Sequence, residues 1–503
     1  MAFEKNKFMV AKKAFLQKGE LAVECNIDTQ CSVQKVLAVH VSPCVGSSEV
    51  LSGVVNYGGS VDVKIIFMTN EGEISSVSSV CPFSSRFEGE EIVVGGCPFI
   101  NVDIIDYSCE VVGDSTVKVA VVVVQSGFIV FNKEESVLHC DDESVCYQNE
   151  DMEVLRYAGC GQDVVEIESD INIRENIKKI LLTESKVLIK NVEAGANYVA
   201  VSGDVISRIL YISENDKFES GYIYDSFKQE VELAGTNRDS LVEGYGSICQ
   251  EKVVAEIVQD EKGCRVVVKN PITLSVFAYD NQVVSVITDI YGTKEEINVV
   301  TNSFDMTELC GSEVVEGKIE GSLVLEEDKP RVDKVLFNGG ARATITNQYV
   351  RDGEIFIEGI AQTTVVYLND ETSQLYSVVV DVPFVVSDKT NCKEGRFVLQ
   401  PTITDVDIAV KKGREFIFAA KVKIKVVCSC QVANAVICDA VAGGLYAEKD
   451  YAMEVIFAKK GSGLWQTAKL ARVKEEQILF QNPDVIFPVE EDTPLILFYQ
   501  KQA

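Results

Sequence analysis

Apolar and polar residues alternate along most of this 503-residue chain. In residues 421–426, Lys-Val-Lys-Ile-Lys-Val, every second side chain is a lysine and the others are apolar. This period of two is typical of a half-buried antiparallel strand. Similar runs occupy 63–67, 115–124, 203–212, 263–268 and 355–368, with turn signals such as Asn70-Glu71-Gly72 between them. The pattern predicts a mainly β protein built of antiparallel β-sandwiches or partly open barrels.

One set of residues recurs three times at nearly constant spacing. Each copy has a Lys–apolar–Leu triplet, then a glycine, an aromatic residue and a closing phenylalanine. The triplets end at Leu37, Leu181 and Leu336, the glycines are Gly59, Gly203 and Gly359, the aromatic residues are Phe67, Tyr211 and Tyr367, and the phenylalanines are Phe83, Phe227 and Phe384. Such repetition predicts tandem copies of one structural unit, with the phenylalanines as core anchors.

A second motif marks where the copies begin. The sequence CGxxVVE starts at Cys160 and again at Cys310, and a degenerate form starts at Lys18. We therefore predict three repeats, at 1–135, 136–300 and 301–435, followed by a different domain at 446–503. Because Cys160 and Cys310 occupy equivalent positions, we interpret them as part of the repeat geometry and not as reactive groups.

The charge composition limits the kinds of molecule that this protein is expected to bind. The chain has 77 acidic and 47 basic residues, a formal net charge of −30. This charge repels nucleic acids and anionic lipid, and favours basic or neutral proteins, or uncharged glycans. The alternative is that the acidity only keeps a large β protein in solution.

The N-terminal residues lack a signal-peptide pattern, and no stretch approaches the roughly 18 apolar residues of a membrane span. We therefore expect a cytoplasmic protein without a membrane span, whose 16 cysteines are mostly reduced thiols. If the protein enters an oxidising layer later, disulfides are the expected alternative.

The sequence offers little for catalysis. His40 and His139 are the only histidines, which disfavours a histidine-based triad or a common zinc hydrolase site. Neither the group Cys140, Cys146, Cys160 and His139 nor the group Cys428, Cys430 and Cys438 has the spacing of a common zinc site. There is no P-loop and no dinucleotide-binding glycine motif. We predict no enzyme, no catalytic residues, no bound metal and no cofactor.

The final residues follow another pattern, a strand, two helices and a strand. They resemble a LysM domain, a small α+β (βααβ) fold, through 461–468 (Gly-Ser-Gly-Leu-Trp-Gln-Thr-Ala), Leu479 and 482–484 (Asn-Pro-Asp). The usual Asp-Ser/Thr pair is replaced here by Ser462-Gly463, and Thr467 replaces the usual isoleucine. LysM domains commonly bind N-acetylglucosamine polymers. The resemblance implies glycan-binding or partner-binding candidates at Ser462, Gly463, Leu464, Asn482, Pro483 and Asp484. The alternative is that Leu464 and Trp465 are simply core residues, and that the domain docks a protein instead of a glycan.

The repeats themselves resemble SPOCS domains. The resemblance rests on 332–336, on 354–359 and on the run from Val365-Val366-Tyr367 to Val382-Pro383-Phe384, and it is clearest in the third copy. SPOCS domains occur in spore-forming Clostridia, often in several copies ahead of a LysM module. The arrangement is similar to spore coat morphogenetic proteins of the SipL type, which partner the coat ATPase SpoIVA. The resemblance implies a protein of the mother-cell cytoplasm that acts at the forespore surface in the spore coat.

These observations support three interpretations. The first is a non-enzymatic scaffold for coat assembly, with the repeats for spacing and multimerisation and the tail for docking a SpoIVA-like ATPase, another coat protein or the forespore surface. The second is an envelope protein that binds peptidoglycan or N-acetylglucosamine. The third is a subunit of a self-assembling fibre or shell, because exposed strand edges of tandem β domains pair between chains.

Overall fold

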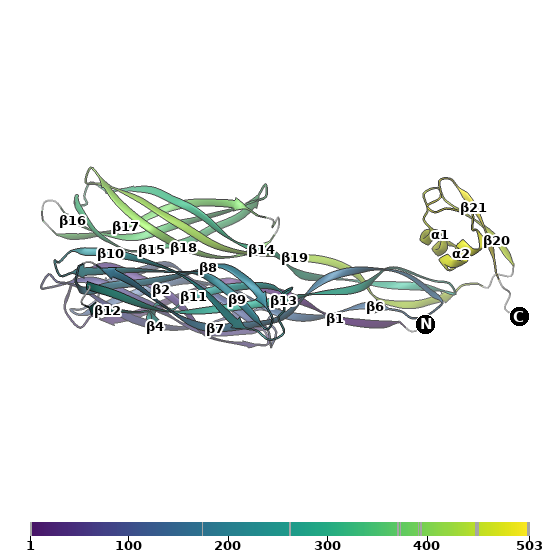
Figure 1. The fold of residues 1–503 in the computed structure, drawn as a ribbon, viewed down its shortest axis with the longest axis horizontal. Helices are drawn as coiled ribbons and strands as arrows, with labels where there is room; N and C mark the ends of the chain where they lie inside the picture. Colours follow the sequence, from purple (N-terminus) through teal and green to yellow (C-terminus); the bar gives the residue numbers. More distant parts are fainter. Residues whose placement is uncertain are drawn as a thin grey trace.

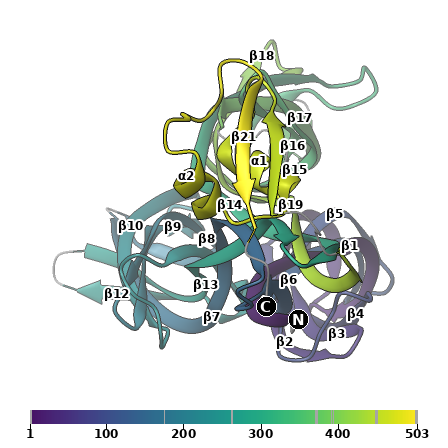
Figure 2. The ribbon, with the colours of Figure 1, turned by 90° about the vertical axis from the view of Figure 1, so that its right-hand side faces the viewer.

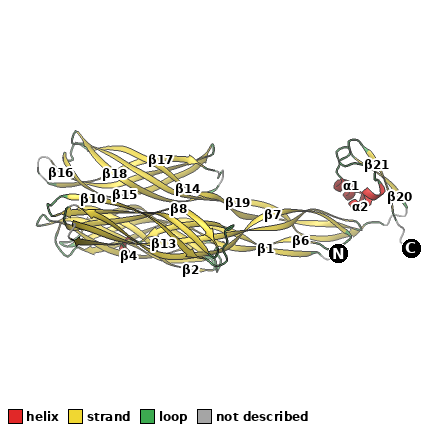
Figure 3. Cartoon of the chain, in the orientation of Figure 1, coloured by secondary structure: helices red, strands yellow, loops and turns green. Residues whose placement is uncertain are grey.

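The structure, a computed structural model, describes residues 3–173, 175–260, 263–369, 372, 374–390, 392, 395–447 and 452–499. It confirms a mainly β protein of small antiparallel sheets. α-Helices in the described residues occur only near the C-terminal end (Figure 3).

The first unit consists of two three-stranded sheets. Its strands are β1 (Glu4–Asp28), β2 (Val33–Leu51), β3 (Val54–Thr69), β4 (Ile74–Glu88), β5 (Cys97–Val111) and β6 (Thr116–His139). One sheet has the order β1-β6-β5 and the other the order β2-β3-β4. Valine, isoleucine and aromatic side chains from both sheets form one shared core, in which Val55, Val61, Val117 and Val119 are fully buried.

The third unit repeats this plan. Its strands are β14 (Glu295–Val324), β15 (Val332–Arg351), β16 (Glu354–Asn369), β17 (Leu375–Lys389), β18 (Arg396–Lys411) and β19 (Glu415–Leu445). The sheets have the orders β14-β19-β18 and β15-β16-β17, so each strand corresponds to a strand of the first unit.

The second unit differs in one strand. Its strands are β7 (Val145–Ile173), β8 (Ile177–Gly195), β9 (Tyr198–Ser213), β10 (Phe218–Glu232), β11 (Leu241–Ile248), β12 (Val254–Asp260) and β13 (Gly263–Gly292). The sheet β10-β9-β8 corresponds to β4-β3-β2. In the other sheet, β13 pairs with β7 on one side and with both β11 and β12 on the other. Residues 135, 300 and 435, where the sequence predicted unit ends, lie inside β6, β14 and β19.

The three units pack side by side around a common long axis, and each sends out one pair of long strands (Figures 1 and 2). These pairs, β1 with β6, β7 with β13 and β14 with β19, form a stalk between the units and the C-terminal domain. All three pairs contribute to its core, for example through Phe8, Val284 and Phe304. The units are therefore parts of one assembly and not independent domains joined by linkers.

The Lys–apolar–Leu triplet forms a β-bulge in each unit. In β2, Val36 pairs with Phe67 and Ala38 with Ile66, which leaves Leu37 without a partner on β3. The same irregularity occurs at Leu181 in β8 and Leu336 in β15. Bulges redirect a side chain from its regular position. The three leucines contribute to a core shared by all three units, with Leu37 and Leu181 buried and Leu336 partly buried. The triplet thus holds the units together.

The repeated glycine and the closing phenylalanine face each other on neighbouring strands. The pairs are Gly59 with Phe83, Gly203 with Phe227 and Gly359 with Phe384. A Cβ at position 59 would lie 2.5 Å from the carbonyl oxygen of Cys44 and 2.6 Å from Cζ of Phe83. The ring therefore lies over the space that a larger residue would need, and Phe384 does the same at Gly359, where its Cζ would be 2.6 Å from an added Cβ. At Gly203 the nearest atom would be the carbonyl oxygen of Leu188, at 2.2 Å. Phe227 and Phe384 are buried, whereas Phe83 is partly buried.

We expect Gly59→Ala to lower the free energy of unfolding by about 1–3 kcal/mol, because the clash involves backbone and ring atoms. The matched control is Gly58→Ala, whose added Cβ would have its nearest contact at 3.9 Å. Urea unfolding of both variants measures the difference. Equal losses of stability in the two would show that the glycine–phenylalanine contact is not the cause.

Disulfides also connect the units, contrary to the expectation of mostly free thiols. Half of the cysteines form four pairs: Cys25–Cys81, Cys44–Cys249, Cys97–Cys160 and Cys392–Cys428. The second and third pairs join the first unit to the second. The packing of the units brings together sulfur atoms that are up to 205 residues apart in sequence.

Candidate functional site

The C-terminal domain has the predicted order of strand, two helices and strand. Its elements are β20 (Met453–Ala458), α1 (Leu464–Ala471), α2 (Glu475–Gln481) and β21 (Thr493–Phe498). The strands pair antiparallel, and one face of their sheet packs on the helices through Leu495 and Leu497, which are fully buried together with Ala468 and Ile478. Neither α-helix in the described part of the chain is long and apolar enough to cross a bilayer.

The first predicted loop lies at the start of α1. Gly463 is the N-cap, and its N–H donates to the side-chain oxygen of Gln466. The carbonyl of Ser462 accepts a hydrogen bond from the N–H of Val489. Leu464 packs partly into the core of the domain. Gly463, as the N-cap, and Leu464, as a core residue, therefore have a clear structural use, whereas the hydrogen bond of Ser462 involves only its backbone.

The second predicted loop follows α2. The Asn482 side chain donates to the carbonyls of Ile478 and Ile496 and accepts from the N–H of Ile496, so it ties α2 to β21. Pro483 and Asp484 are exposed. The N–H of Gly461 donates to the carbonyl of Val489, and the N–H of Val489 donates to the carbonyl of Ser462, which brings the first loop close to the far end of the second. Ser462, Pro483 and Asp484 remain the candidates whose side chains are available to a ligand.

The outer face of the β20–β21 sheet is apolar and exposed, which the sequence analysis missed. Its side chains form three cross-strand pairs: Met453 with Phe498, Val455 with Ile496 and Phe457 with Pro494. We call these six residues the outer sheet face. Val455 is 49% exposed, Phe457 55% and Phe498 55%. In the sequence, the residues on both faces of each strand are largely apolar. In the structure only one of these faces packs on the helices, so the other is exposed.

The domain contacts the stalk through α1. Trp465 Nε1 donates to Asp289 Oδ2 at 2.8 Å, and Lys469 pairs with the same carboxylate. The ring of Trp465 packs on Tyr291, whose hydroxyl donates to the carbonyl of Val473. Burial alone would raise the pKa of Asp289, but the hydrogen bonds from Lys469 and Trp465 outweigh it and lower this pKa. Because the helices face the stalk, the outer sheet face is left uncovered.

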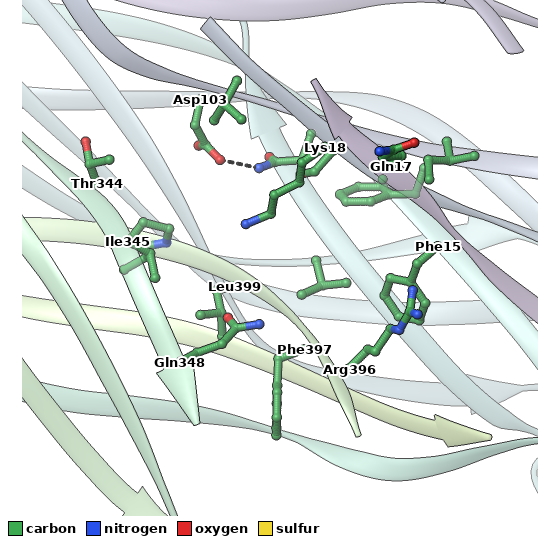
Figure 4. A pocket seen from close by; sticks show the side chains of 18 of the residues that line it. Phe15, Gln17, Lys18, Asp103, Thr344, Ile345, Gln348, Arg396, Phe397 and Leu399 are labelled. Atoms are coloured by element: carbon green, nitrogen blue, oxygen red, sulfur yellow. Dashed lines mark hydrogen bonds between the residues drawn. The ribbon is translucent and has the colours of Figure 1, made fainter. Parts of the chain in front are cut away.

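A cavity of about 570 Å³ lies between the first and third units (Figure 4). Phe15, Lys18 and Asp103 line it from the first unit, and Arg396 and Phe397 from the third. No histidine or cysteine occurs among the described residues of its lining.

Charged side chains meet where the three units join near the axis. His40 of β2, Glu184 of β8 and Gly340 of β15 lie so close that a Cβ on Gly340 would be 2.7 Å from Glu184 Oε2 and 3.2 Å from His40 Nδ1. Lys64 of the first unit donates to the carbonyl of Thr183 of the second. Lys186 and Arg208 of the second unit donate to carbonyls of the third. These groups serve to join units, and burial lowers the pKa of His40 to about 4.

We expect this histidine to make the assembly sensitive to acid. Between pH 6.5 and pH 4 the unfolded chain binds a proton at His40 and the folded chain does not, so stability falls as the pH falls. The loss is on the order of 3 kcal/mol over this range. Urea unfolding at several pH values should show a weaker pH dependence in His40→Gln. The control is His139→Gln, because the His139 side chain is 38% exposed; an identical effect of both variants would contradict the assignment.

Comparison with known protein families identifies a matching domain in the first unit. Residues 32–112 match the family model described as SipL, SPOCS domain. The matched segment contains β2 to β5 of the first unit, the copy in which the sequence motif is most degenerate. A SPOCS domain indicates a sporulation-related role in protein interactions and an involvement in the spore coat. No match was found among curated proteins or among solved structures.

Proposed function

We propose that this protein is a non-enzymatic scaffold of spore coat assembly, in which the C-terminal domain docks a coat protein of the SpoIVA type. The three units form the body of the scaffold, and the stalk holds the C-terminal domain at a distance from this body (Figure 1). The outer sheet face is the observation that carries this proposal. It is a contiguous apolar surface on a small domain, of the kind that marks a protein interaction site.

The charge distribution supports a protein partner. Residues 451–503 carry six basic and seven acidic residues, so the domain is nearly neutral although the whole chain is at −30. Binding through this domain therefore depends little on long-range charge, and an apolar contact surface is the stronger source of affinity.

The domain also resembles a LysM module, and its loops offer the second candidate function. Ser462, Pro483 and Asp484 are the described loop residues that a peptidoglycan chain would contact. Asn482 is less suited, because its side chain already makes three hydrogen bonds to backbone groups.

Two binding assays on the full chain separate these functions. The proposal expects co-purification with the cognate coat ATPase and no sedimentation with insoluble peptidoglycan. Sedimentation with peptidoglycan without capture of the ATPase would instead establish the glycan-binding envelope protein. Electron micrographs test the fibre or shell alternative, which requires assemblies that grow with concentration.

A further inference from the structure

Four cysteines converge at the point where the third unit meets the stalk. Cys428 and Cys430 lie two residues apart on β19, so their side chains share one face of the sheet. Cys310 is the extra residue of a β-bulge in β14, between Leu309 and Gly311, which pair with Ser429 and Cys428. Cys392 precedes β18, the neighbour of β19 on its other side.

The sulfur atoms of these residues lie within reach of one ion. Those of Cys310, Cys392 and Cys428 are all within 4.8 Å of one another, and that of Cys430 is 3.4 Å from that of Cys310. Four thiolates around a zinc ion, with Zn–S distances of about 2.3 Å, have sulfurs about 3.8 Å apart. Cys310, Cys392 and Cys428 supply three of the four sulfurs. That geometry forms once the Cys392–Cys428 bond is reduced and the Cys430 side chain turns from Cys310 toward the other two.

The backbone next to the cluster leaves room for the sulfurs. A Cβ on Gly395 would lie 2.4 Å from the sulfur of Cys392 and 2.8 Å from that of Cys428. Cys392 and Cys428 are almost completely buried, whereas Cys310 and Cys430 are partly exposed. The site is thus closed on one side and accessible to an ion on the other.

We propose that the reduced chain binds one zinc ion through Cys310, Cys392, Cys428 and Cys430. A disulfide between Cys392 and Cys428 uses two of the four sulfurs and leaves Cys310 and Cys430 as adjacent thiols. Zinc uses all four, each after loss of its proton, in the closed tetrahedral arrangement of a structural site. Soft thiolate ligands favour zinc over magnesium or calcium.

The local charge favours a cation. Glu308 Oε2 lies 3.5 Å from the sulfur of Cys430. Zinc at this place ties the segment before β18 to β14 and β19 where the two long strands leave the unit.

Metal content tests the proposal. The full chain is prepared with a phosphine reductant, incubated with Zn²⁺, freed of excess metal and analysed by native mass spectrometry. We expect one zinc ion per chain in the wild type and its loss in C430S and C392S. The control is C438S on the same strand, which should keep the zinc. With Co²⁺ as probe, the wild type should show the visible absorption of a tetrahedral thiolate site.

Two results would overturn the proposal. One is a reduced wild-type chain that retains no zinc and gives no thiolate–cobalt absorption, a result that does not depend on how any variant folds. The other is equal zinc retention in the wild type and in C430S, with circular dichroism showing that both are folded.

Discussion

Replacing Lys13 with methionine is expected to lower the free energy of unfolding by about 3–5 kcal/mol, because it leaves a buried carboxylate without its partner. Lys13 Nζ lies 2.8 Å from both carboxylate oxygens of Glu243, and the two side chains are only 1% and 4% exposed. Lys13 belongs to β1 of the first unit and Glu243 to β11 of the second. The Lys13 N–H also donates to Thr307 of the third unit, so the residue contacts all three.

Two further variants separate this effect from a loss of packing. Lys7→Met removes a lysine of the same strand that pairs with Glu134 at 2.6 Å, and both of these side chains are exposed. It should change stability little, since exposed ion pairs contribute little. The double variant Lys13→Met/Glu243→Leu removes both buried charges and should recover part of the loss. Urea unfolding midpoints measure all three, and equal midpoints for Lys13→Met and Lys7→Met would refute the role of the pair.

A polar outer sheet face is expected to weaken capture of the coat partner strongly. The variant Val455→Asp/Ile496→Asp places charges on a central cross-strand pair of that face. If this pair is the centre of the interface, affinity should fall by at least about 2 kcal/mol, roughly 30-fold. Affinity for the coat ATPase is measured with the full chain by surface binding or calorimetry.

The matched variant changes a predicted loop and leaves the sheet intact. Ser462→Ala/Asp484→Ala alters side chains that the glycan hypothesis requires and should not weaken capture of the ATPase. Thermal unfolding of both double variants checks that the domain remains folded. Capture that persists in the sheet variant and is lost in the loop variant would place the partner site on the loops instead.

The alternation of residues was sufficient to predict antiparallel strands, and the repeated motif predicted three copies of one unit. Neither pattern could show that the units share cores. Leu37 and its two equivalents look like ordinary strand residues, and only the register between strands shows that each is a bulge residue directed at the neighbouring units. The long strands of the stalk, such as β13, continue an alternation that is indistinguishable from that of a strand inside a unit.

The disulfide pairings between distant cysteines could not be predicted from the sequence either. Sixteen cysteines allow very many sets of disulfides, and the alternating pattern ranks none of them. In the tail, the element order followed from the change of period at residue 451, and the candidate loops followed from the resemblance. The outer sheet face was missed because strands that are apolar on both sides are expected to be buried on both sides.

Hydrogen exchange of the full chain, with and without the coat ATPase, tests the central claim most directly. The account predicts that the ATPase slows exchange in 453–458 and 493–498, the two strands of the outer sheet face, and leaves residues 461–464 and 482–485 unchanged. Protection confined to those loops, or to the three units with none in the tail strands, would contradict it.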